Sequence, residues 1–124
     1  RKAMTSATAA IVSSGTATLE CAVEDTPIVV CYKLSSLSWL LTKLMTSIHY
    51  ASIVNLIADD AIVPEYLQNK MTPENLAAAV EPLLDTSNAK RKKMLTGFDT
   101  VRRTLGVPGV YGRAAEAIVS RNKE

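Results

Sequence analysis

Residues 14–18, which read Ser-Gly-Thr-Ala-Thr, have side chains and backbone suited to binding an anion. They follow a short apolar run at 9–13 and precede residues with a helical pattern, which predicts a strand-to-helix junction. Gly15 lets the backbone approach an anion closely. The hydroxyls of Ser14, Thr16 and Thr18 can donate hydrogen bonds to phosphate oxygens. Because Ser-Gly is also ordinary turn chemistry, a phosphate-binding loop and a plain turn both stay open.

Glu20 lies one turn inside the helix that this junction should start. A carboxylate at that position can accept hydrogen bonds from the two ribose hydroxyls of a nucleotide. In an open parallel sheet, ligands bind beyond the carboxyl ends of the strands, where helix N-termini present unpaired amides. The junction and Glu20 together therefore indicate a nucleotide site, although the segment is neither a GxGxxG nor a Walker loop.

The first third of the chain predicts a strand, a helix and a second strand. Residues 27–32 form a continuous apolar run rather than an alternating one, which is typical of a parallel strand covered on both faces. A helix capped by Ser35 or Ser36 should follow, with leucines at positions 37, 40, 41 and 44 on one face. We expect a third short strand and a polar loop between residues 48 and 62.

Helices should close the chain. A short one is expected at 64–68, and a second begins after Thr72 with Pro73 in its first position. A third runs from about Asn88 to Gly106, and a last one follows Pro108. Inward-facing residues are expected on the last three of these helices. In chain order they are Leu76, Val80, Leu83 and Leu84, then Met94, Leu95, Phe98, Val101 and Leu105, then Tyr111, Ala115 and Ile118.

Together these elements predict an α/β fold that amounts to half a Rossmann-like domain. It should have about three parallel strands, flanking helices and a helical C-terminal tail. Residues 1–70 would form the βαβ nucleotide-binding part and residues 71–124 the C-terminal helices. The sequence starts at Arg1 without an initiator Met and soon enters a strand, so we expect a preceding segment.

Composition narrows the class of protein. The formal net charge of +2 is too small to indicate nucleic-acid binding, and the basic run at 90–93 has no aromatic residues among its cations. That run is interpreted as a solvated helix face, with contact to an anionic lipid or a phosphorylated ligand as the alternative. Cys21 and Cys31 lie in apolar segments without metal-ligand spacing, so neither a metal nor a disulfide is expected. No membrane span or signal peptide is recognisable, which favours a soluble, non-secreted protein.

Several ordered segments resemble the lipid-A-disaccharide synthase family. Residues 14–20 match its SGTATLE segment, and residues 27–30 and 32–33 follow at the family's spacing. Residues 52–58 (SIVNLIA) are similar to SLPNLIA, and residues 63–68 (VPEYLQ) to VPELLQ. The match extends through residues 72–77 and 82–84 and covers nearly the whole chain.

This resemblance implies the C-terminal part of a two-domain GT-B glycosyltransferase. Its substrates would be UDP-2,3-diacylglucosamine as donor and 2,3-diacylglucosamine 1-phosphate as acceptor, joined by an inverting β-1,6 transfer that releases UDP. The amides of Gly15, Thr16 and Ala17 would hold the diphosphate without a metal or other cofactor, and Glu20 would bind the ribose. Asn55 would contact the diphosphate or donor sugar, with a loop-capping role as the alternative. Gln68 would bind the ligand or cap a short helix.

The resemblance also leaves parts of the reaction outside this chain. The catalytic base is expected in the missing N-terminal domain, so the fragment alone should be inactive. The family usually has Gly-Arg where this sequence has Asp59-Asp60, which removes a cation for which Lys33 or Arg113 could compensate. Two adjacent carboxylates could also form a catalytic pair, but neighbouring loop residues diverge.

The expected location is the cytoplasmic side of the inner membrane, with peripheral contact, or an organelle in a eukaryote. A homo-oligomer is expected because an incomplete domain exposes a sheet edge and apolar faces, and residues 111–119 could exchange between chains. Two other classes stay open: a non-catalytic module that binds a sugar nucleotide or lipid, and another UDP-sugar GT-B transferase or epimerase.

Overall fold

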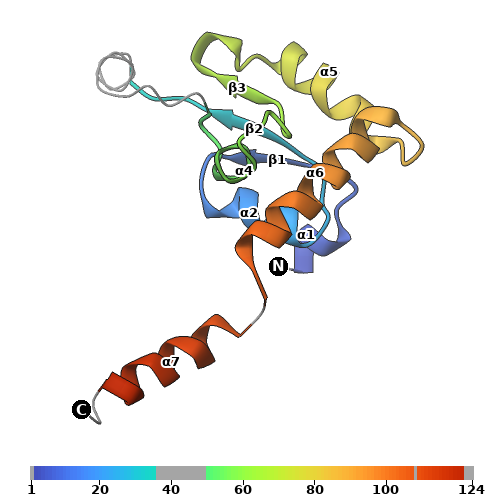
Figure 1. Cartoon of the computed structure of the whole chain (residues 1–124). Coiled ribbons are helices and arrows are strands. Elements are labelled where there is room, and N and C mark those ends of the chain that lie inside the picture. The colour runs from blue at the N-terminus through green and yellow to red at the C-terminus, as the bar shows by residue number, and fades with distance from the viewer. Residues whose placement is uncertain (1, 36–49, 108, 122–124) are drawn as a thin grey trace.

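Three parallel strands form the centre of the structure, a computed structural model that describes residues 2–35, 50–107 and 109–121. The strands β1 (Ala10–Ser13), β2 (Ile28–Tyr32) and β3 (Glu65–Leu67) lie in that order across the sheet (Figure 1). Ala10 is opposite Ile28 in the first pair, and Val30 is opposite Glu65 in the second. The predicted α/β class with about three parallel strands is confirmed.

The central strand carries the core because it is covered on both faces. Ile28, Val29 and Val30 are fully buried. Helix α2 (Thr16–Val23) connects β1 to β2 and buries Cys21 and Ala22 against them. Burial raises the pKa of the Cys21 thiol, and the nearby Glu20 carboxylate raises it further. A neutral Cys21 therefore acts as a small apolar residue, as the sequence indicates.

The third strand is not where the sequence predicts it. Residues between 48 and 62 were expected to supply a strand, but Ile53–Ala58 forms helix α4, started by the Ser52 side chain, which accepts a hydrogen bond from the amide of Asn55. The short helix expected at 64–68 is instead β3, followed by the 3-10 turn η1 (Gln68–Lys70). Pairing with β2 decides this, and such a non-local partner leaves no local sequence signal. The helix expected after Ser35 or Ser36 lies outside the described residues.

Helices α5 (Pro73–Leu84) and α6 (Ala89–Leu105) begin where the sequence predicts, and α6 also ends as predicted. The side chains of Thr72 and Asn88 accept first-turn amides, and Gly106 follows α6 with a positive φ of 80°. Leu83, Met94, Phe98 and Val101 are buried as expected. Leu84 and Leu105 are not: they are 55% and 45% exposed, because they are the last residues of their helices and lie past the packed turns.

Helix α6 packs against α2 and α4. A charged contact of Arg102 adds to this packing. The Arg102 guanidinium donates to the carbonyl of Ala22 at 2.9 Å and pairs with Asp25 at 2.5 Å and with Asp99. The hydrogen bond to Asp25 is the main reason why the pKa of Arg102 is raised. The interaction joins α6 to the turn between α2 and β2.

The two ends of the chain differ from the expected pattern. A short helix, α1 (Lys2–Ser6), precedes β1 and was not predicted; its Met4 carbonyl accepts a hydrogen bond from Thr26 at 2.7 Å. Helix α7 (Val110–Arg121) extends away from the body in Figure 1. Tyr111, Ala115 and Ile118 were expected to face inward, but all are exposed, Tyr111 by 89%, because α7 stands away from the other described elements (Figure 1). Within the described residues, none of the helices has the length and apolar content needed to cross a membrane.

Gly97 allows the close approach of α6 to the loop that precedes β3. A Cβ at this position would overlap Cγ2 of Ile62 and lie 2.9 Å from its Cδ1. We expect Gly97→Ala to lower the free energy of unfolding in urea by about 1 kcal/mol, since overpacking of about 1–3 kcal/mol outweighs a gain of about 1 kcal/mol in helix propensity.

Gly112→Ala is the matched control, because it places the same methyl group on a helix where nothing described lies within 4 Å. It should leave the unfolding midpoint unchanged or raised. Ile62→Ala should remove most of the penalty of Gly97→Ala in the double variant. Unchanged or greater stability of Gly97→Ala alone would contradict the contact.

Candidate functional site

The glycine junction stands at the carboxyl end of β1, as the sequence predicts. Gly15 is the N-cap of α2, with φ 152° and ψ −167°. This backbone conformation is strained for a residue with a side chain. Of the described heavy atoms, none lies within 4 Å of the position that a Cβ would take. The space beside the backbone is therefore open to a ligand, and the first amides of α2 are the ones that a helix leaves without an intrahelical acceptor.

Two of the three hydroxyls predicted to bind phosphate have structural roles. Thr18 is fully buried, and its Oγ1 donates to the carbonyl of Gly15 at 2.7 Å. Ser14 Oγ donates to the carbonyl of Ala51 at 2.6 Å. Their protons hold the loop, so in this conformation neither can donate to a phosphate. Thr16 alone of the three is exposed and keeps a hydroxyl that can reach a ligand, and Ala17 is half-buried behind it.

Two exposed charges lie near this junction in the topology. Glu20 is exposed on α2, one turn after Gly15. Lys33 is exposed and follows β2 directly. Because β1 and β2 are parallel neighbours, their carboxyl ends lie at the same edge of the sheet. This edge thus presents free amides and a cation for an anion, and a carboxylate for hydroxyl groups.

Glu65 organises the region next to the junction. The sequence predicts no role for this residue. Its Oε2 accepts the amide of Ala51 at 2.7 Å, and its Oε1 accepts the amide of Ser52 at 2.9 Å and the side chain of Asn55 at 2.8 Å. These groups stand at the start of α4, where the helix dipole favours a negative charge. In the sequence, the signal for a role of Glu65 is its position in segment 63–68, which resembles the family.

Asn55 is a positioning residue in this structure. It is 1% exposed, and its Nδ2 donates both to Glu65 and to the carbonyl of Val63 at 2.9 Å. Its Oδ1 accepts the amide of Val63, also at 2.9 Å. Both amide hydrogens are used, so the expected contact with diphosphate or donor sugar has no free donor here. The geometry is that of the loop-capping alternative.

Gln68 also binds the protein's own backbone. Its Oε1 accepts the amide of Leu34 at 3.2 Å, which ties the end of β3 to the segment after β2. The residue has a positive φ of 52°. The short helix that it was expected to cap is the strand β3, and its contact with a ligand stays a prediction.

The Asp59-Asp60 pair lies at the other end of α4 from the glycine junction. Asp59 is the C-cap with φ 51°, the left-handed conformation that a glycine adopts at lower cost. Asp60 Oδ1 accepts the amide of Ala61 at 2.7 Å. Because α4 is a helix rather than a loop, it separates the pair from Ser52 and from the contact of Ser14 with Ala51.

A cavity of about 940 Å³ runs along β3 between α5 and the start of α6. Asn55, Glu65 and Gln68 line it, whereas none of residues 14–20 does. In the described part of the chain, no three His, Cys, Asp or Glu side chains form a group that could hold a metal ion. The predicted site residues therefore divide between an open junction at the sheet edge and the wall of a separate cavity.

A parallel sheet whose first strand ends in a glycine junction that opens a helix is the arrangement of nucleotide-binding α/β domains. The chain belongs to the lipid-A-disaccharide synthetase family, whose model matches residues 1–107. This confirms the resemblance carried by the ordered segments of the sequence.

The curated relatives are similar along most of this chain. A lipid-A-disaccharide synthase from Anaeromyxobacter sp. (strain K) is 42% identical over 111 residues, which cover 90% of this chain and 29% of that protein. The one from Solibacter usitatus is 44% identical over 117 residues, covering 94% and 30%. The one from Prochlorococcus marinus is 40% identical over 116 residues, covering 92% and 29%. The chain thus spans less than a third of the length of these relatives.

Replacing Asn55 tests its positioning role. Asn55→Ala would leave the buried amide and carbonyl of Val63 without partners, so we expect the free energy of unfolding in urea to fall by about 2–4 kcal/mol. Asn75→Ala is the matched control, because the exposed Asn75 side chain donates one hydrogen bond to the carbonyl of Lys70. It should cost less than about 1 kcal/mol. An equal loss of unfolding free energy in the two variants would contradict a positioning role for Asn55.

Proposed function

We propose that this chain is the part of a lipid-A-disaccharide synthase that holds the UDP of the donor. The observation that carries the proposal is the open glycine junction: free first-turn amides of α2 beside Gly15, at the carboxyl edge of a parallel sheet. Family membership supplies the reaction class, a glycosyl transfer in lipid A biosynthesis.

The proposed reaction joins UDP-2,3-diacylglucosamine to 2,3-diacylglucosamine 1-phosphate. The 6-hydroxyl oxygen of the acceptor forms a bond to the anomeric carbon of the donor with inversion, and the bond from that carbon to the UDP oxygen breaks. The hydroxyl proton passes to a base, and UDP leaves with the bonding electrons. Such a step needs stabilisation of the negative charge that develops on the departing diphosphate.

In this proposal the amides of Gly15, Thr16 and Ala17, with the positive end of the α2 dipole, stabilise that charge. The hydroxyl of Thr16 and the ammonium group of Lys33 add to it, and neither a metal nor another cofactor takes part. Glu20 accepts hydrogen bonds from the ribose. Preorganisation supports the scheme, because Ser14 and Thr18 hold the loop through their own hydrogen bonds.

The base and the acceptor site belong, in this proposal, to a preceding N-terminal domain. The chain covers less than a third of its relatives, so the regions that could supply these groups lie outside the matched part. Residues 1–70 would then be the nucleotide-binding part and residues 71–124 the C-terminal helices of one GT-B domain. Alone, the chain would bind nucleotide without turnover. Peripheral contact with the cytoplasmic face of the inner membrane would follow from the lipid substrates.

The proposed nucleotide site can be tested by titrating UDP into the chain in a calorimeter. We expect Glu20→Ala to weaken binding by about tenfold to a hundredfold, since hydrogen bonds to a charged group contribute about 1.5–3 kcal/mol. Gly15→Ala should abolish binding, because its Cβ would occupy the open space beside the amides. Glu81→Gln, an exposed carboxylate on α5, is the control and should leave the affinity unchanged.

The absence of any heat with a folded wild-type chain would count against a self-sufficient nucleotide site. Binding of UDP without transfer in the full-length protein would favour the alternative, a non-catalytic module. Transfer of a different sugar would indicate another UDP-sugar transferase.

We further propose that α7 mediates a homo-oligomer. Along α7, Tyr111, Ile118 and Val119 are exposed, and a contiguous exposed apolar patch marks an interaction surface. Figure 1 shows α7 away from the body, a position from which residues 111–119 could pack on a second chain.

Light scattering after size exclusion tests this association. We expect a dimer or larger oligomer for the wild type, and a monomer for Tyr111→Ser/Ile118→Ser, because the double change removes apolar area from α7. Leu84→Ser/Leu105→Ser is the control, since it replaces two exposed apolar residues elsewhere and should keep the oligomer. A wild type that stays monomeric at high concentration would contradict the proposal.

A further inference from the structure

The cavity beside β3 has a character different from that of the glycine junction. It occupies about 940 Å³, at the upper end of the range of about 300–1,000 Å³ for small-molecule sites. β3 is the last strand of the sheet, so one wall is a sheet edge, and α5 and the first turns of α6 form the others. Residues 14–20 take no part, so a ligand here would leave the proposed nucleotide site free.

Apolar side chains form most of the lining. Val63, Leu83 and Met94 are buried beneath it, and Ile62, Tyr66 and Pro82 are half-buried along its walls. Asn55 and Glu65 also line it, but their polar atoms are used by Val63, Ala51 and Ser52. Gln68 and Asn69 add polar side chains, so the lining suits a ligand that is apolar along most, but not all, of its surface.

Cations stand around the apolar lining. Lys70, Lys90 and Lys93 line the cavity and are exposed, and within the described residues none of them forms an ion pair. Lys90 and Lys93 are three positions apart on α6, so they project on the same side of the helix. Among the described residues that line the cavity, Glu65 is the only carboxylate. The rim is thus positive, and the interior is apolar.

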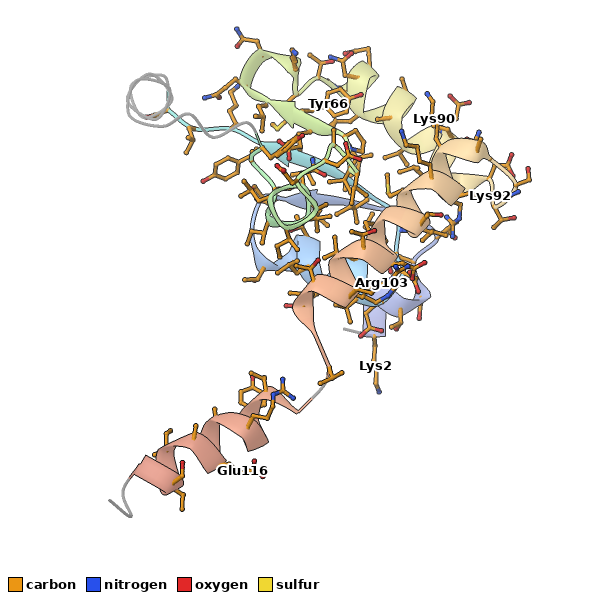
Figure 2. All side chains as sticks on the ribbon, viewed as in Figure 1. Lys2, Tyr66, Lys90, Lys92, Arg103 and Glu116 are labelled. Carbon is orange, nitrogen blue, oxygen red and sulfur yellow. The ribbon has the colours of Figure 1, made fainter. Side chains whose placement is uncertain are left out.

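The figures agree with this arrangement. Figure 2 labels Tyr66 on β3 and Lys90 at the start of α6, and both lie beside α5. Lys92, labelled further along α6, does not line the cavity, and neither does Arg91, so two cations of the basic run at 90–93 line the cavity and two do not.

We propose that this cavity binds a single-chain anionic amphiphile, with its acyl chain along Ile62, Tyr66 and Pro82 and its phosphate or carboxylate at Lys90 and Lys93. The mainly apolar lining favours an acyl chain over a nucleotide or a free sugar, and the lysines at the rim favour an anionic headgroup over a cationic one. This assigns to the basic run a ligand of its own, separate from UDP.

The probe is 1-oleoyl lysophosphatidic acid, kept below its micelle concentration and titrated calorimetrically into the chain. We expect saturable binding with one molecule per chain, weakened by added salt because part of the affinity is electrostatic. Monooleoylglycerol, which keeps the chain without the charge, and glycerol 3-phosphate, which keeps the charge without the chain, should each bind at least about tenfold more weakly. Equal binding of the neutral lipid would overturn the proposal, as would binding to phosphatidylglycerol vesicles without binding to the monomer.

Two pairs of variants locate the ligand. Lys90→Gln/Lys93→Gln should weaken binding by about tenfold, whereas Lys92→Gln on the same turn should not. Ala78→Trp should block the cavity, whereas Ala77→Trp should not, since both are exposed on α5 but only Ala78 lines the cavity. Circular dichroism and UDP affinity serve as controls for folding, so loss of lipid binding with UDP binding intact separates this site from the nucleotide site. Unchanged lipid affinity in both Lys90→Gln/Lys93→Gln and Ala78→Trp would overturn the assignment.

Discussion

The hydrogen bonds of the Glu65 carboxylate are the interaction on which the arrangement of this chain depends. Glu65 begins β3, and its two oxygens accept the amides of Ala51 and Ser52 and the side chain of Asn55. A carboxylate is only an acceptor when ionised, and three N–H donors at the start of α4 satisfy it. One side chain thereby joins the edge strand to the start of α4.

The same set of contacts reaches the glycine junction. Ala51 donates its amide to Glu65 and accepts the hydroxyl of Ser14 with its carbonyl, so the loop before Gly15 is connected to β3 through a single residue. Gln68 adds a second connection at the carboxyl edge through Leu34. A loop held from several sides keeps its amides in place without a ligand, which is the condition for electrostatic stabilisation of a departing diphosphate. Ser14 and Gln68 resemble ligand contacts in sequence, but in this structure their hydrogen bonds hold the loops beside the backbone amides that remain free.

Open surfaces of the chain have different chemistry, which separates their proposed partners. The junction offers amides and small polar groups, the cavity beside β3 offers an apolar interior with lysines at its rim, and α7 offers exposed apolar side chains. The chain spans under a third of the length of these curated relatives. The core of the described residues is built around β2, and Arg102 joins α6 to the end of α2.

The sequence by itself determined the α/β class, the first βαβ unit, both long helices with their caps, and the family. These follow from local signals: continuous apolar runs, helical spacing, and side chains that cap nearby amides. Only the tertiary structure decided that residues 65–67 form a strand, that Thr18 and Asn55 are structural, and that Asp59 and Asp60 lie away from the junction. The role of Glu65 also emerged only there. The strand and the roles of Thr18, Asn55 and Glu65 depend on a distant partner or on burial, and neither is encoded in the spacing of neighbouring residues.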